Sequence, residues 1–183
     1  MKNVYFLTIA IGLLLISGCG KTTTTSDENA SPGQTATVDK IDLSKQDLKK
    51  IPSTVFESSG VTRLNLSGNN LTSIPVEIGQ LKDLKVLDLS DNNLTSIPGE
   101  IGQLKNLEVL NLGNNSLTNI PAEIGQLKKL QTLDLSNNKL TGLPNELGNL
   151  KKLLTLHVFG NDYSEFDLEI IKKGLPRNVN IIK

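Results

Sequence analysis

The sequence contains a single cysteine, Cys19, and a single histidine, His157, among its 183 residues. A structural zinc site needs several such ligands and an internal disulfide needs a pair of thiols, so the sequence provides neither. No serine, cysteine or metal ligand accompanies His157 in the sequence pattern, which favours a surface residue or a pH-sensitive contact over a catalyst. Since a Gly-rich phosphate loop is also absent, we expect no catalytic residue, metal, cofactor or enzymatic activity.

Carboxylates recur at fixed intervals in two sets. The first set consists of Glu77, Glu100, Glu123, Glu146 and Glu169, and lysines follow the first four: Lys82, Lys105, Lys128 and Lys151. Acid before base complements a local helix dipole, so we interpret this set as a solvated surface and not as a metal or acid-base site. The second set is Asp42, Asp88 and Asp134, with Asn65 and Asn111 between them. Because successive carboxylates would lie two strands apart, about 10 Å would separate them, which is too far to share a proton.

A 23-residue period determines the elements that position these side chains. It is marked by Leu64, Leu87, Leu110 and Leu133, and it extends back to Ile41 and forward to Leu156 and Val179. A fixed period in this range indicates stacked coils, whose apolar side chains are buried only against neighbouring coils. Phe166 shares the register of Ile97 and Ile120, so we expect it to point inward with them.

Each coil begins with an alternation such as Leu87-Asp88-Leu89, which predicts a short strand with one buried side. The last strand is expected over residues 178–181. An asparagine follows the strand in every coil but the first, which has Gln46, at the point where the chain turns towards the core and its backbone needs new hydrogen-bond partners. Because an amide both donates and accepts, we expect a structural ladder of asparagines. Its members are Asn69, Asn92, Asn115, Asn138 and Asn161.

The pattern LxxLxLxxNxL, with Leu84, Leu87, Leu89, Asn92 and Leu94 at its fixed positions, resembles the leucine-rich repeat family. The full unit, LxxLxxLxLxxNxLxxIPxEIGQ, is similar to the 23-residue bacterial and plant-like types of that family and covers about residues 38–183. The resemblance implies an α/β repeat fold, a curved solenoid of about six repeats and a terminal strand. The implied solenoid has a parallel concave β-sheet and short helical or 3-10 segments on its convex side.

Proline and glycine are expected to shape the convex segments. A proline such as Pro98 would occupy the first turn, where its missing amide costs nothing. A glycine such as Gly102 would allow either a close backbone approach or a positive φ.

The outward strand residues would form one extended concave surface, where we expect binding. This surface is more charged at its amino-terminal end and more apolar at its carboxyl end. An exposed Phe159 would suit a hot spot for a protein partner, but segment 163–178 would equally suit a cover over it. The candidate binding residues are Lys40, Asp42, Arg63, Asn65, Lys85, Asp88, Asn111, Asp134, His157 and Phe159.

Residues 1–18 have the order of a secretory signal peptide: a positive charge, an apolar run and small residues. The tetrapeptide Ile16-Ser17-Gly18-Cys19 resembles the bacterial lipobox, which implies a diacylated Cys19 as a membrane anchor. An ordinary signal peptide and an uncleaved anchor helix remain alternatives. Residues 19–37 would then be the lipidated cysteine and a flexible Thr/Ser-rich tether, and residues 38–183 the repeat domain. Gly20 implies outer-membrane sorting if the host has two membranes.

The balanced charge, 19 basic and 19 acidic side chains, argues against nucleic acid as a partner. We predict a lipid-anchored binding module of the bacterial cell envelope, an adhesin, receptor or scaffold whose concave face binds an unidentified protein. A periplasmic spacer without a specific ligand and a carbohydrate or peptidoglycan binder are the alternatives. The sequence does not indicate which side of the membrane the domain occupies.

Overall fold

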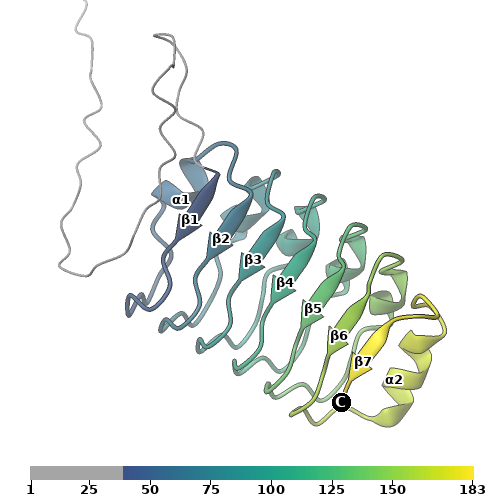
Figure 1. The fold of residues 1–183 in the computed structure, drawn as a ribbon. Helices are drawn as coiled ribbons and strands as arrows, with labels where there is room; N and C mark the ends of the chain where they lie inside the picture. The colour runs from purple at the N-terminus through teal and green to yellow at the C-terminus, as the bar shows by residue number, and fades with distance from the viewer. Residues whose placement is uncertain (1–38) are drawn as a thin grey trace, which may run out of the picture.

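Seven three-residue strands lie side by side in one parallel sheet, in the order in which they occur in the chain (Figure 1). The computed structural model describes residues 39–183. The strands are β1 (Lys40–Asp42), β2 (Arg63–Asn65), β3 (Val86–Asp88), β4 (Val109–Asn111), β5 (Thr132–Asp134), β6 (Thr155–His157) and β7 (Asn180–Ile182). Because each strand pairs with the preceding and following ones, the sheet is open and the chain advances as a stack of coils. The predicted solenoid is confirmed.

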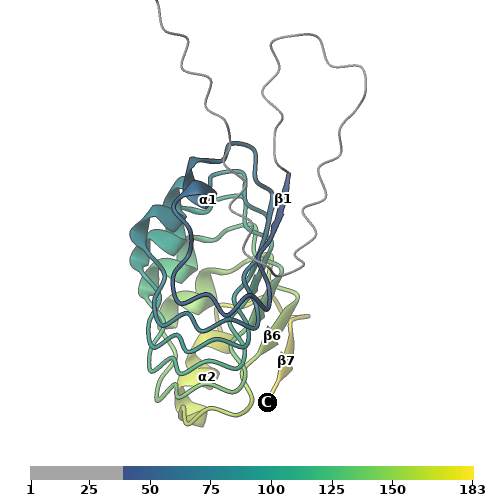
Figure 2. The ribbon, with the colours of Figure 1, turned by 90° about the vertical axis from the view of Figure 1, so that its left-hand side faces the viewer.

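Short helical segments form the opposite, convex side of the coils (Figure 2). They are α1 (Thr54–Glu57), the 3-10 helices η1 (Val76–Gln80), η2 (Gly99–Gln103), η3 (Ala122–Gln126) and η4 (Asn145–Asn149), and α2 (Glu165–Lys172). A proline precedes each 3-10 helix at the N-cap, one position earlier than predicted. The ψ of Pro75 is 155°, an extended value, while its carbonyl accepts a 3.1 Å hydrogen bond from the Ile78 amide. Proline therefore starts the turn from outside it.

The middle residue of each strand points into one core between the sheet and the convex helices. Leu87 and Leu110, in inner coils, have 0% exposure. Ile41 and Ile181, in the two end strands, are only partly buried. An inner coil has a neighbour on both sides and an end coil has one, so burial follows from stacking.

The last coil departs from the 23-residue period. Ile181, and not Val179, lies opposite Leu156, so β7 is two residues later than predicted. The cause is α2, which has eight residues where the preceding coil has the five of η4. Its helical geometry turns Leu168 into the core and leaves Phe166 72% exposed. The prediction that Phe166 points inward is therefore wrong.

Close packing between convex segments explains why glycine recurs there. A Cβ at Gly102 would lie 2.6 Å from the carbonyl oxygen of Glu123 in the next coil. Gly102 does not have a positive φ. Close approach is therefore the reason for glycine, and the alternative of a positive φ is wrong at this position.

None of the helices within residues 39–183 is long and apolar enough to cross a membrane. The predicted signal peptide (1–18), the tether (19–37) and the lipidation site Cys19 lie outside the described residues.

Candidate binding face

The concave face consists of the first and third residues of each strand, because the middle residue is directed into the core. The first residues form one row: Lys40, Arg63, Val86, Val109, Thr132, Thr155 and Asn180. The third residues form a second row: Asp42, Asn65, Asp88, Asn111, Asp134, His157 and Ile182. The register thus aligns the predicted binding residues of the strands, and Ile182 lies at the end of the second row.

The aspartates and asparagines of the second row close the turn that follows each strand. Asp88 Oδ1 accepts hydrogen bonds from the Ser90 amide (3.0 Å) and from Ser90 Oγ (2.7 Å). Asp42, Asn65 and Asp134 make the same pair of bonds to the serine two residues later, and Asn111 bonds the Gly113 amide. Sequence reasoning missed this role. The repeated Asp/Asn-x-Ser spacing, typical of a local side-chain turn, is the signal that predicts it.

A charged hollow of about 460 Å³ opens at the amino-terminal end of the concave face. Its polar lining comes from three adjacent strands, and the residues are Lys40, Asp42, Arg63, Asn65 and Asp88. In the described part of the chain the ion pairs are Lys172–Glu169 and Lys183–Glu165, so neither cation of the hollow is paired with a carboxylate. Lys85, predicted with this group, is exposed but does not line the hollow.

An apolar patch lies at the opposite end, on β6 and β7 and the residues that flank β6. It consists of Phe159 and Ile182, which are 37% and 36% exposed, while Leu154, 49% exposed, precedes β6 at the other end of that strand. The ring of His157 is 6.4 Å from that of Phe159, at an interplanar angle of 54°. Helix α2 packs against η4 on the convex side of the coils (Figure 2), and Phe159 is exposed. Of the two alternatives for Phe159, the exposed one is therefore correct. Ile182 belongs to the patch because the register of β7 is shifted.

The five ladder asparagines bond the backbone of their own coil and of the preceding coil. Asn115 Nδ2 donates to the carbonyls of Leu89 and Leu112 at 3.0 and 3.1 Å, and its Oδ1 accepts from the Leu94 amide at 3.0 Å. Asn69, Asn92, Asn138 and Asn161 repeat this arrangement. These side chains hold the concave strands in register and are not accessible to a partner at the inner positions.

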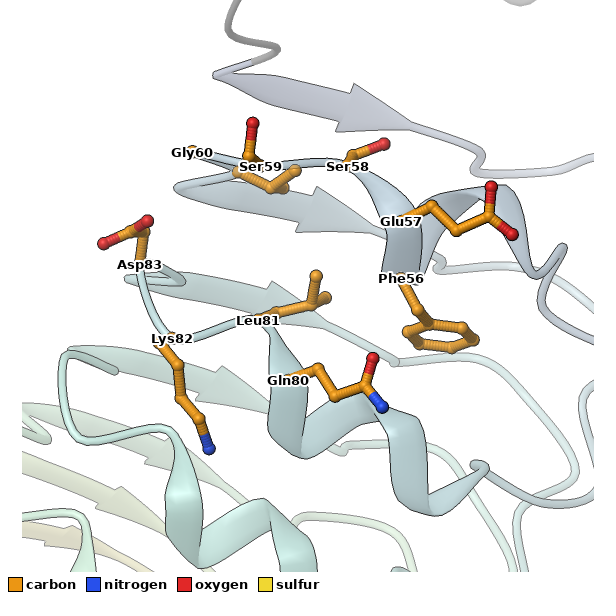
Figure 3. Close-up of a pocket in the computed structure, with 10 residues that line it drawn as sticks. Phe56, Glu57, Ser58, Ser59, Gly60, Gln80, Leu81, Lys82 and Asp83 are labelled. Carbon is orange, nitrogen blue, oxygen red and sulfur yellow. The ribbon is translucent and has the colours of Figure 1, made fainter.

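A second hollow of about 420 Å³ lies beside α1, where Ser58, Ser59 and Gly60 replace the regular end of a convex segment (Figure 3). Glu57 and Asp83 point away from each other in this region. Lys82 Nζ donates a hydrogen bond to Gln103 Oε1 at 2.8 Å. No charged groups converge there, so we attribute this hollow to the irregular packing of the first coil.

Residues 39–183 contain no group of three histidine, cysteine, aspartate or glutamate side chains placed to hold a metal ion. The concave face itself presents charged, hydrogen-bonding and apolar side chains.

Comparison with solved structures supports the leucine-rich repeat fold. The chain is 44% identical to a leucine-rich repeat protein of Leptospira interrogans, with a TM-score of 0.75 over 79% of this chain and 36% of that one. It is 42% identical to the ectodomain of the Arabidopsis thaliana receptor kinase GASSHO1/SCHENGEN3, solved with CASPARIAN STRIP INTEGRITY FACTOR 2 (TM-score 0.58; 62% of this chain, 14% of that one). Against the plant peptide hormone receptor RGFR1 in complex with RGF2, identity is 30% (TM-score 0.60; 73% and 22%).

The chain thus spans about a third of the length of the Leptospira protein and less of the two plant receptors. No curated protein gives a significant match. The family model for the leucine-rich repeat matches four overlapping segments, 36–94, 59–117, 82–140 and 105–162, which together extend over most of the chain. With the repeat, the fold and the family model in agreement, the protein is a member of the leucine-rich repeat family.

Proposed function

We propose that this protein is a lipid-anchored binding module of the bacterial cell envelope and that its concave face holds a protein partner. Leucine-rich repeat domains generally mediate protein–protein interactions and are typically non-enzymatic. The observation that carries the proposal is the concave face itself, where a charged hollow and an exposed apolar patch lie at the two ends of one continuous surface. Aromatic and arginine side chains are enriched at binding hot spots, and Phe159 and Arg63 are exposed on this surface.

The binding test uses substitutions in the first row, because the second-row aspartates also stabilise their own turns. Val109 and Thr132 lie at the centre of the face, are partly exposed and begin β4 and β5. Val109→Arg and Thr132→Arg place bulk there without removing a turn hydrogen bond. Ala122→Arg, at an exposed position on the convex side, is the matched control.

Partners are captured by crosslinking the full-length protein in intact cells and are identified from the crosslinked complex. We expect the two concave variants to lose the crosslinked partner and the convex control to keep it. Retention of the partner by all three variants would place the binding site elsewhere on the domain, whereas the absence of any crosslinked partner would favour a spacer role.

The anchor is supported by the lipobox-like sequence Ile16-Ser17-Gly18-Cys19. Two acyl chains, at about 0.8 kcal/mol per buried methylene, would attach the protein stably to a membrane. Metabolic labelling with a fatty acid should mark the wild-type protein and not Cys19→Ala. Equal labelling of both proteins would refute the anchor without affecting the proposal for the concave face.

The side of the membrane is tested by adding protease to intact cells. Cleavage of the domain would place it on the cell surface, whereas protection that disappears when the envelope is opened would place it in the periplasm. Both results are compatible with a binding module, but they select different classes of partner.

A further inference from the structure

The distance between the charged hollow and the apolar patch limits the length of a partner segment that can contact both. The hollow is centred on β2 and the apolar patch on β6, so four strand-to-strand steps lie between them. At roughly 4.8 Å for each step this distance is about 19 Å, which an extended peptide of about six residues spans at roughly 3.3 Å per residue.

The amino-terminal end offers two cations to one ligand group. Lys40 and Arg63 occupy neighbouring positions in the first row, and the register pairs them directly. Both side chains line the hollow together with the carboxylates of Asp42 and Asp88, and within residues 39–183 neither cation forms an ion pair. Like charges on paired strand positions repel each other, and a carboxylate between them relieves that repulsion. An arginine and a lysine together also match a carboxylate by charge and by hydrogen-bond geometry.

The second row offers hydrogen-bonding groups along the distance between the two ends. The turns engage Oδ1 of Asp88, Asn111 and Asp134. Oδ2 of the two aspartates and Nδ2 of Asn111 form no hydrogen bond within the described residues. The row therefore presents acceptor, donor and acceptor in turn. Free acceptors suit the N–H groups of an extended main chain, and free donors suit its C=O groups.

The carboxyl end offers apolar contact instead of charge. Phe159 stands at the position that serine occupies in most other coils, where the serine bonds the aspartate or asparagine two residues earlier. Ile182, which the register pairs with His157, adds a second exposed apolar side chain at this end. An apolar side chain of the partner is the group that gains free energy by covering this patch.

We propose that the concave face binds an extended segment of a partner protein in one orientation. An acidic residue of that segment lies over β1 and β2, and an aromatic or large aliphatic residue about six positions away lies over β6 and β7. This inference rests on the proposed function of the concave face and adds the chemistry and the spacing of the ligand.

The test uses an array of immobilised peptides with a Gly/Ser background, each with one glutamate and one phenylalanine separated by one to ten residues. The full-length protein is applied to the array. We expect binding to be strongest when the separation is about five to seven residues. If no peptide bound, or if all separations bound equally, the inference would be overturned. The proposed function would still be supported if Val109→Arg blocked the crosslinking of the natural partner.

Charge reversal tests the amino-terminal end. Arg63→Glu should weaken binding of the glutamate peptides about tenfold and should favour the matching peptides in which lysine replaces glutamate. Lys139→Glu reverses an exposed charge that forms no side-chain hydrogen bond within residues 39–183, so it is the control and should leave the preference unchanged. An unchanged preference in Arg63→Glu would overturn the assignment of the acidic residue to this end.

Replacement of the aromatic ring tests the carboxyl end. Phe159→Ser introduces the residue that most other coils carry at this position, so the turn gains a side chain that it accommodates elsewhere. We expect this variant to bind peptides with phenylalanine no more tightly than peptides with serine at that position. It should still bind peptides with glutamate more tightly than those without it. Loss of both advantages together, or of neither, would contradict the two-ended arrangement.

Discussion

At the scale of single residues, the ladder asparagines show how much a buried amide contributes. Asn92 is 7% exposed, and its Nδ2 donates to the carbonyls of Leu66 and Leu89 while its Oδ1 accepts from the Leu71 amide. We expect Asn92→Ala to lower the free energy of unfolding by about 3 kcal/mol, because it leaves buried backbone groups without partners. Asn93→Ala removes an exposed amide next to it and should change stability by less than about 0.5 kcal/mol. Denaturant titration of both variants measures the difference, and equal losses would contradict the structural role.

Glu169, a member of the first carboxylate set, shows how a neighbouring charge changes the pKa of a single side chain. Lys172 Nζ donates to Glu169 Oε1 at 2.6 Å, which holds the pKa of Glu169 below its ordinary value. A lowered pKa in the folded state means that the carboxylate contributes stability above its unfolded pKa, and that this contribution is lost as the pH falls through the folded pKa. The pair is solvent-exposed, so the contribution is small. We expect Lys172→Met to raise the pKa of Glu169, as followed by NMR titration, and an unchanged pKa would show that the pair does not form in solution.

The sequence predicts ladder asparagines and strand leucines because each answers a need that every coil repeats. It does not reveal whether an exposed aspartate serves a partner or its own turn, since both roles require the same side chain. Asp88 illustrates this ambiguity, because its bonds to Ser90 are local whereas its second oxygen remains free of intramolecular bonds. Binding is therefore better tested at Val109, which has no such local role.

At the scale of elements, the convex helices are limited by backbone contact between coils. Gly102→Ala would bring a Cβ against the backbone of Glu123, which cannot move without displacing η3. We expect a loss of about 2 kcal/mol from this overpacking. Gly99→Ala in the same helix meets only the flexible side chain of Glu123, and Ala122 occupies the equivalent position in the next coil, so it should be nearly neutral. Thermal unfolding of the two variants measures the contrast, and similar losses would show that backbone contact is not the cause.

The last coil shows where periodicity stops predicting an element. Its sequence from Ser164 onward forms an α-helix with a side-chain N-cap, in which Ser164 Oγ accepts from the Asp167 amide at 3.2 Å. The longer helix displaces the following strand by two residues. A shift of two preserves the inward and outward alternation, so Ile181 still faces the core and Ile182 the concave face. The fold was therefore predictable here, whereas the composition of the apolar patch was not.

At the scale of the whole molecule, each coil contacts only its neighbours, so stability is approximately a sum of coils and interfaces. The consecutive pairs from η1 to η4 and the repeated strand register have equivalent geometry. An inner coil is thus exchangeable as a unit, provided that the cut preserves the 23-residue period. Removal of a partial coil instead places polar side chains at core positions and leaves ladder groups unpaired.

This modularity allows the distance between the two ends of the concave face to be changed without altering either end. Deletion of residues 108–130 joins Leu107 to Gln131 and removes β4 and η3, while the hollow and the apolar patch are retained. We expect a folded protein with a lower melting temperature, because one coil and its interface are lost. The peptide separation that gives the strongest binding should fall by about one to two residues, since one strand step of roughly 4.8 Å corresponds to that length of extended chain. Deletion of residues 108–118 is the control and should unfold the domain by circular dichroism. If the shortened, folded protein kept the original optimum, the acidic and apolar contacts would not lie at opposite ends of the face.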